Sequence, residues 1–414
     1  MDLSQHDFKA IGEEYGTPFY LYDIDAAAAH LKTLQDGLPD NTDVLYCVKA
    51  NPNPKIIAMY RDLVPGLDMS SGGEVELAMK VGWSPEVMSF AGPGKTDEEL
   101  TLAISNSLGS LSVESIGELR RAAAIASNLG TKARVLLRIN PESIPKAFMM
   151  KMGGIASQFG IPEEQIDEAI EAAKTLDGIH LRGFHIFSGT QCLKLEGAMD
   201  NIRQTLEISR KLAVKHDITI EEINLGGGVG VAYFPGEEDI APDELSSSLN
   251  ALITEFRNQT PDLADAHLVI ELGRYLIARF GVYVTHVTDV KGTRGKQFAI
   301  LNGGMNHCFP ATGNFGQLIK KNYPIVNLSR DAAEDDLVKM EVVGPLCTPL
   351  DSMARSLPMA QAEVGDLVAF NNCGAYAYSA SPLMFLSHKT PIELIYRHGE
   401  IIVGRRRLSA ADFI

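Results

Sequence analysis

A lysine at position 49 ends an apolar run and is the residue best placed to do chemistry. The run Val44-Leu45-Tyr46-Cys47-Val48 is typical of a strand buried on both faces, and Lys49-Ala50-Asn51-Pro52 turns the chain. At the carboxyl end of a parallel strand, a lysine projects into the mouth where α/β proteins bind ligands. A desolvated amine there can lose its proton and condense with an aldehyde. The alternative is a lysine that extends from a strand end into water.

Three further predicted strands also end in candidate site residues. They end in His185-Ile186-Phe187-Ser188-Gly189, in Asn224-Leu225-Gly226-Gly227-Gly228 and in Glu271-Leu272-Gly273-Arg274. Consecutive glycines let the backbone approach a phosphate and offer it N–H donors. A carboxylate at Glu271 could keep the ring nitrogen of pyridoxal phosphate protonated, and Arg274 and Ser188 could bind its phosphate. Ordinary explanations stay open for each: a core histidine, a Glu271–Arg274 salt bridge, a capping serine and a tight glycine turn.

Alternating strands and helices would position these residues. The predicted strands are 43–49, 66–70, 87–91, 109–113, 133–139, 181–187, 220–225 and 267–272. The predicted helices are 24–36, 53–62, 73–81, 96–106, 115–129, 162–175, 196–216 and 243–258. Eight such units in roughly 250 residues predict a closed (β/α)8 TIM-type barrel over residues 24–278. A doubly wound open sheet is the rival architecture.

The sequence changes character beyond about residue 278. Strand-like runs at 282–290, 297–302, 338–343, 366–371, 391–396 and 400–403 are separated by glycine and proline turns. This pattern predicts an antiparallel β domain, a barrel or a sandwich. Because the strand-like segment 18–22 could join it, we expect this domain to comprise residues 1–23 and 279–414.

The composition excludes several functional classes. The chain has 414 residues, with 37 basic against 53 acidic side chains and a net charge of −16, which argues against nucleic-acid or anionic-membrane partners. The five cysteines lack C-x-x-C spacing and indicate reduced thiols in a cytoplasmic protein without a zinc site. The first residues do not form a signal peptide, and no apolar run approaches the ~20 residues of a membrane span.

Taken in order, the motifs resemble the fold type III pyridoxal-phosphate decarboxylases, the ornithine/diaminopimelate/arginine decarboxylase family. The resemblance covers nearly the whole chain. It rests on Tyr46-Cys47-Val48-Lys49-Ala50-Asn51, His185 with Ser188-Gly189, Gly226-Gly227-Gly228, Glu271-Leu272-Gly273-Arg274, Cys347 and Gly374-Ala375-Tyr376. Alanine racemases share the barrel but place an arginine at the pyridine nitrogen, so Glu271 favours decarboxylation. A racemase or epimerase, and a non-catalytic cofactor-binding protein, are the alternatives.

The resemblance implies a role for each matching residue. Lys49 would form the Schiff base with pyridoxal phosphate, His185 would stack on its ring, and Asp68 would support both. Glu271 would pair with the pyridine nitrogen. The phosphate would be held by Ser188, Gly227, Gly228, Arg274 and Tyr376. Cys347 would enter the active site of the partner subunit of a homodimer and help reprotonate the product, a step that suits a thiol because its proton is mobile near neutral pH.

Other segments resemble a subgroup that includes the butirosin-pathway and exosortase-associated decarboxylases. They are Phe90-Ala91-Gly92-Pro93-Gly94-Lys95-Thr96, Lys151-Met152-Gly153-Gly154, Gly313-Asn314-Phe315-Gly316-Gln317, Gly344-Pro345-Leu346-Cys347-Thr348-Pro349 and Ser381-Pro382. The butirosin-pathway enzyme acts on a glutamyl group tethered to an acyl carrier protein. Thr348 stands where several basic-amino-acid decarboxylases have an acidic residue for the distal amine of the substrate.

The resemblance therefore predicts α-decarboxylation of an amino acid or an amino-acid-derived intermediate, which is free, conjugated or carrier-bound. A diaminopimelate- or ornithine-type decarboxylase is the alternative. We expect residues 306–323 and 141–158 to line or gate the substrate entrance. There Lys151, Lys320 and Lys321 could meet an acidic side chain, an acidic carrier surface or only solvent.

Overall fold

The computed structural model describes residues 1–315, 317 and 320–413, and the chain forms two compact units. The barrel unit comprises His30–Val231 and Glu238–Tyr275, and the sheet unit comprises Met1–Ala29, Ala232–Glu237 and Leu276–Ile414. Gly316 of the motif at 313–317, and residues 318 and 319 of the expected entrance segment, lie outside the described residues. Every helix in the described part of the chain is too short or too polar to cross a lipid bilayer.

Parallel strands of the barrel unit close into a ring. Within the described residues these are β2 (Thr42–Cys47), β3 (Gly66–Met69), β4 (Met88–Ala91), β5 (Ser110–Val113), β6 (Ala133–Asn140), β9 (Ile179–His185), β11 (Glu222–Gly227) and β12 (His267–Leu272). Neighbours along this series pair in parallel, and β12 pairs with β2 to close the ring. The predicted eight-stranded barrel is confirmed. The open-sheet alternative is wrong, because in an open sheet the two edge strands do not pair with each other.

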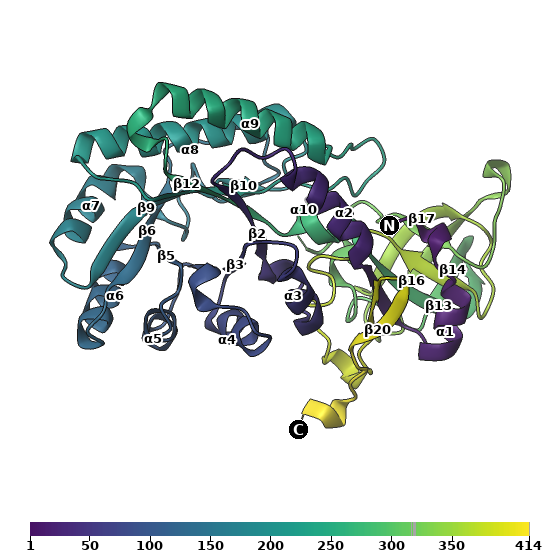
Figure 1. Cartoon of the computed structure of the whole chain (residues 1–414). Coiled ribbons are helices and arrows are strands. Elements are labelled where there is room, and N and C mark those ends of the chain that lie inside the picture. The colour runs from purple at the N-terminus through teal and green to yellow at the C-terminus, as the bar shows by residue number, and fades with distance from the viewer. Residues whose placement is uncertain (316, 318–319, 414) are drawn as a thin grey trace. The chain divides into compact units, whose positions relative to one another are not determined.

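Helices cover the outside of this ring (Figure 1). They are α3 (Pro54–Tyr60), α4 (Gly72–Lys80), α5 (Asp97–Ser105), α6 (Ile116–Asn128), α7 (Ile166–Thr175), α8 (Leu195–His216) and α9 (Pro242–Gln259), and α2 (Ile24–Gln35) precedes β2. The hydroxyls of Ser71, Thr96 and Ser115 cap α4, α5 and α6 by accepting backbone N–H groups of the first turn. These caps fix where each helix begins after the preceding strand.

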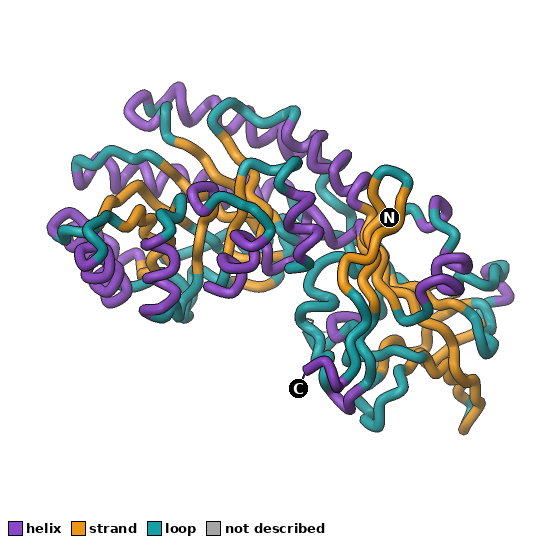
Figure 2. The backbone as a smooth tube through the Cα atoms, turned by 60° about the horizontal axis from the view of Figure 1, so that its bottom comes forward, coloured by secondary structure: helices purple, strands orange, loops and turns teal. Residues whose placement is uncertain are grey.

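The sheet unit is built mainly of strands, with short helical segments beside them (Figure 2). Its strands are β1 (Phe19–Asp23), β13 (Gly281–Thr293), β14 (Lys296–Leu301), β15 (Ile325–Asn327), β16 (Val338–Val343), β17 (Ser352–Met359), β18 (Leu367–Phe370), β19 (Ile392–Arg397) and β20 (Glu400–Arg405). β1 lies between β13 and β19, so the sheet joins both ends of the chain. Most pairs are antiparallel, whereas β1–β19 and β14–β16 are parallel.

Several elements differ from the sequence prediction or were not predicted. β9 ends at His185 and β2 ends at Cys47, each two residues before the predicted end, because apolar periodicity does not show where ladder pairing stops. β17 was missed because Pro358 and three polar side chains interrupt its apolar pattern. Other helices and strands that were not predicted are α1 (Phe8–Tyr15), α10 (Arg274–Ile277), β7 (Met150–Lys151), β8 (Ile161–Pro162), β10 (Gly189–Thr190) and β15 (Ile325–Asn327).

Candidate active site

Lys49 lies in a 3-10 turn, Val48–Ala50, directly after β2. Its Nζ is 3.1 Å from Oδ2 of Asp68, a fully buried residue on β3. Burial and the negative charge of Glu271 raise the pKa of Asp68, Lys49 partly offsets both, and the net value is about 6. The structure therefore pairs the predicted amine with the carboxyl group that the sequence assigned to its support.

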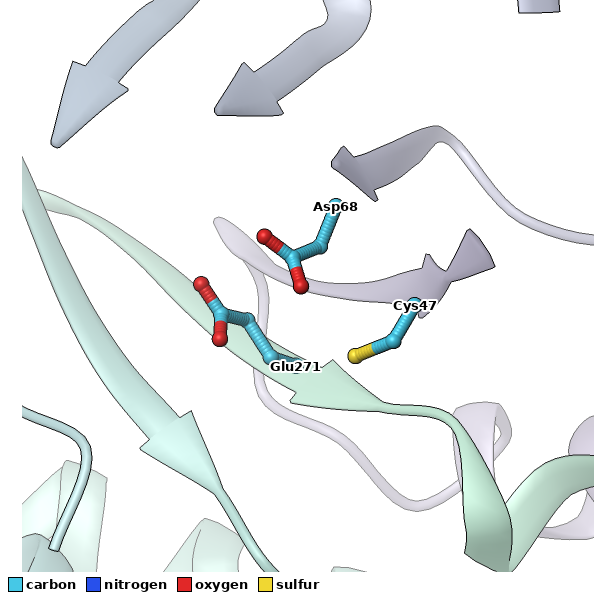
Figure 3. A group of neighbouring side chains, drawn as sticks. All are labelled: Cys47, Asp68 and Glu271. Atoms are coloured by element: carbon cyan, nitrogen blue, oxygen red, sulfur yellow. The ribbon is translucent and has the colours of Figure 1, made fainter. Parts of the chain in front are cut away.

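Three side chains converge at the carboxyl ends of β2, β3 and β12: Cys47, Asp68 and Glu271 (Figure 3). One potential ligand atom of each lies within 4.8 Å of the others, a spacing that would also suit a metal ion. Burial raises the pKa of the Cys47 thiol well above its usual range. With two carboxyl groups and a neutral thiol, this pocket attracts a cationic group.

His185 is the last residue of β9 and is buried. Its Nδ1 is 2.9 Å from Oγ of Ser112, and its Nε2 is 3.5 Å from Oε1 of Glu271. Burial and the positive charge of Arg138 lower the pKa of His185 to about 3, so the imidazole is neutral at neutral pH. A neutral, immobilised ring suits stacking against a planar ligand.

Glu271 lies on β12, beside the end of β11. Asn224 Nδ2 donates a hydrogen bond to Glu271 Oε1 at 2.7 Å, and the Gly226 N–H donates to Asn224 Oδ1 at 2.9 Å. Asn224 and Glu271 are both buried. The carboxylate is therefore oriented by the residue that begins the glycine-rich loop.

The glycine loop has no room for side chains. A Cβ on Gly226 would lie 2.3 Å from the carbonyl oxygen of Ile186, one on Gly227 would lie 1.8 Å from that of Glu271, and one on Gly228 would lie 2.1 Å from that of Gly189. Such contacts exclude any residue larger than glycine at all three positions. The three glycines therefore let this loop pack directly against neighbouring backbone, while Gly227 and Gly228 stay partly exposed.

Ser188 lies between β9 and β10, close to this loop in the barrel. Its side chain is buried, and its Oγ has no hydrogen-bond partner among the described residues. Its carbonyl accepts the N–H groups of Met152 and Gly153 at 2.8 and 3.1 Å, so the segment 141–158 is attached to the site at this point. A buried hydroxyl without a partner is costly, and this one is available to a ligand or to a bound water.

The remaining predicted residues lie in different parts of the fold. Arg274 is the first residue of α10. The preceding residue, Gly273, packs closely against Cys47 and Ala50 because it has no side chain. Tyr376 and Cys347 belong to the sheet unit. Tyr376 has a positive φ of 61° and Cys347 is exposed between β16 and β17.

The three lysines of the expected entrance segments are exposed. Lys151 lies on β7, which pairs with β10. Lys321 Nζ is 3.4 Å from a carboxylate oxygen of Glu237, and Lys320 donates to Asn314 at 2.5 Å.

Sequence reasoning missed three side chains that contact the site: Cys47, Ser112 and Asn224. Ser112 and Asn224 are polar residues in the interior of predicted parallel strands, and that position is the signal that could have identified them. Cys47 lies two residues before Lys49 and was quoted only as part of a motif.

The family model for the pyridoxal-binding domain of pyridoxal-dependent decarboxylases matches residues 24–278. The L-glutamyl–BtrI acyl-carrier-protein decarboxylase of Niallia circulans is 34% identical over 100% of this chain and 96% of its own length. The Staphylococcus aureus decarboxylase of 2-((L-alanin-3-ylcarbamoyl)methyl)-2-hydroxybutanedioate is 33% identical, over 91% of this chain and 93% of its own. Among solved structures, the Helicobacter pylori diaminopimelate decarboxylase in complex with L-lysine superposes with a TM-score of 0.87 at 27% identity, covering 98% of both chains.

Proposed function

The chain belongs to the pyridoxal-dependent decarboxylases, and from that premise we propose that it acts on an amino-acid group that forms part of a larger biosynthetic intermediate. The intermediate is conjugated or is tethered to a carrier protein. Two relatives, at 34% and 33% identity, act on substrates of these two kinds. Thr348, a neutral residue beside Cys347, agrees with this class because it offers no charge to a distal amine.

The residues of the barrel mouth fit pyridoxal phosphate. The partnerless Ser188 hydroxyl and the side-chain-free loop Gly226–Gly228 suit its phosphate, and the Glu271 carboxylate suits a protonated pyridine nitrogen. We assign Arg274 and Tyr376 to the phosphate as well. When bound, the cofactor supplies an aldehyde for an amine and a protonated ring that accepts electrons from the bond being broken.

The side chains of the site would orient the cofactor and set the charge around it. Lys49 would hold the cofactor, and Asp68, 3.1 Å from Nζ, orients that amine. His185 would face the ring as a neutral imidazole, because its pKa of about 3 prevents a second positive charge there. The observation that carries the cofactor assignment is that Lys49, directly after β2, contacts Asp68 on the neighbouring strand β3, and that Asp68 belongs to one buried cluster with Cys47 and with Glu271 on β12.

A screen for carbon dioxide release tests the substrate class. Purified enzyme with pyridoxal phosphate is offered free glutamate, diaminopimelate, ornithine, a citrate–diamino-acid amide and carrier-bound glutamyl groups, with Lys49→Ala as the blank. We expect turnover of a conjugated or carrier-bound compound to exceed that of every free amino acid. Preferential turnover of free diaminopimelate or ornithine would contradict the proposal and favour the diaminopimelate-type alternative.

We further propose a homodimer with shared active sites, in which exposed Cys347 protonates the product formed in the partner subunit. Mixing inactive Lys49→Ala subunits with Cys347→Ala subunits tests this arrangement, because each mixed dimer regains one complete site. Random mixing should restore about a quarter of parental activity. No recovery in a demonstrated mixed dimer would exclude the shared site.

The cytoplasmic location is also a proposal. It is supported by the five cysteines, all of which are free thiols in the structure.

A further inference from the structure

Asn224 connects two parts of the site to which the proposed function gives separate tasks. Its side chain is fully buried in the middle of β11. Nδ2 donates to Glu271 Oε1 at 2.7 Å, and Oδ1 accepts the N–H of Gly226 at 2.9 Å. One amide thus bridges the carboxylate assigned to the pyridine nitrogen and the loop assigned to the phosphate.

The chemistry of the two neighbours fixes the orientation of this amide. A backbone N–H can only donate, so Oδ1 must face Gly226 and Nδ2 must face Glu271. Nδ2 in turn requires a lone pair on Oε1. The side-chain contacts of the Glu271 carboxylate with Asn224 and His185 both involve Oε1, so Oε2 takes part in neither of them.

The other end of the amide stabilises a demanding backbone conformation. Gly226 has a φ of +65°, and a Cβ there would lie 2.3 Å from the Ile186 carbonyl oxygen. The Asn224 carbonyl also accepts the Ile186 N–H at 3.1 Å, which attaches β9 to the same point. Displacement of the Asn224 side chain would therefore disturb the loop and the carboxylate together.

We propose that Asn224 is a positioning residue that couples the ring-nitrogen carboxylate to the phosphate loop; this inference rests on the proposed roles of Glu271 and Gly226–Gly228. Binding of the phosphate orders the Gly226 N–H, the amide and Oε1 of Glu271, so that the carboxylate already faces the ring. The ordinary alternative is a local turn, in which only Oδ1 matters. The two explanations differ in whether the Nδ2 donor is needed.

Asn224→Asp separates the two hydrogen bonds of this side chain. It keeps the oxygen that accepts from Gly226 and replaces the donor to Glu271 by a second carboxylate oxygen. We expect the affinity for pyridoxal phosphate to fall about tenfold to a hundredfold, the range for losing a hydrogen bond to a charged group. The visible spectrum of the bound cofactor should also become pH-dependent where that of the parent is constant, since neighbouring carboxylates share a proton. Asn201→Asp, in a buried asparagine of α8, is the matched control and should retain parental affinity and spectrum.

Binding of pyridoxal, which lacks the phosphate, tests the hydrogen bond between Asn224 and the phosphate loop. The ratio of pyridoxal phosphate affinity to pyridoxal affinity should stay near the parental value in Asn224→Asp and should fall in Asn224→Ala, which loses both hydrogen bonds. Parental affinity and a parental pH profile in Asn224→Asp would overturn the coupling. An unchanged affinity ratio in Asn224→Ala would also overturn it.

If the single variant does not fold, the Asn224→Asp, Glu271→Gln double variant is tested instead. In it the amide at position 271 donates a hydrogen bond to the carboxylate at position 224. We therefore expect the melting temperature of the apoprotein to recover and the parental spectrum not to recover. Recovery of both would show a purely structural role and overturn the coupling. If the parent itself lacks a Lys49-dependent cofactor band, the proposed function fails, which separates that failure from this one.

Discussion

The two ends of the barrel differ in how completely their charged groups are paired. At the amino end, Arg182 binds Glu222 at 2.8 Å and Glu221 at 3.1 Å, and His267 binds Asp43 at 2.9 Å. Arg182, Glu222, His267 and Asp43 line a cavity of about 170 Å³, and each is paired with a group of opposite kind. This arrangement is typical of a structural ion-pair network.

At the carboxyl end the polar groups are less satisfied. Asp68 Oδ1 and Ser188 Oγ are buried and have no hydrogen-bond partner among the described residues, and the pKa values of Asp68 and His185 are displaced in opposite directions. A fold can hold such groups only if stability is supplied elsewhere or a ligand completes them. The carboxyl end therefore differs by a fully buried carboxyl group, Asp68, with one oxygen that has no partner among the described residues, and not by the number of its charged residues.

The largest expected effect is on activity, at the carboxyl end. Lys49→Ala should lower decarboxylation by roughly a thousandfold or more and abolish the visible band of the bound cofactor, because Lys49 is the amine that lies beside Asp68 in the proposed site. Absorption spectra and carbon dioxide release measure both. Lys211→Ala, on the exposed face of α8, is the control, and loss of the band in that variant as well would remove Lys49 from its role.

The next effect is on stability, at the amino end. Arg182→Met leaves Glu222 buried without its partner and should lower the free energy of unfolding by about 4 kcal/mol, with activity per folded molecule unchanged. Urea unfolding measures the loss, and adding Glu222→Gln should recover part of it. A large fall in turnover by the folded variant would contradict the distinction between the ends.

Acid stability should depend on His185. Its folded pKa of about 3 lies below its usual value of 6.5, so the neutral form stabilises the apoprotein above pH 6.5 and that stability is lost as the pH falls toward 3. By about pH 4 the loss should reach about 3 kcal/mol in the parent. His185→Gln should abolish this part of the pH dependence in urea unfolding, and an unchanged slope would contradict a buried neutral histidine.

Asp68 should change the pH dependence of stability less than His185 does, and in the opposite direction. Its folded pKa of about 6 lies above its usual value of 3.8, so its contribution to apoprotein stability is greatest at low pH and is lost as the pH rises toward 6. We expect a fall of about 2 kcal/mol between about pH 4 and 6. Asp68→Asn should remove this fall, whereas its persistence would assign the titration to another group.

Residues with a local signature could be predicted from the sequence. Lys49 at the end of an apolar run, the glycine triplet and Glu271 before Gly273 were identified because buried strands and turns leave a mark within a few residues. The strand ends at His185 and Cys47 were each placed two residues too far along, because ladder pairing depends on a neighbouring strand. Ser112 contacts His185 across 73 positions of the chain, and no local pattern contains that contact.

The sequence by itself determined the alternation of strands and helices, the closed barrel and the position of Lys49 just after a barrel strand, since each follows from apolar periodicity and its interruption. Only the tertiary structure decided which buried groups are paired. Ring closure sets β12 beside β2 and β11, and this brings Asn224 to Glu271 and completes the ion pairs at the opposite end. The physical reason is that hydrogen bonding and pKa values depend on distances between strands, which the order of residues along one strand does not specify.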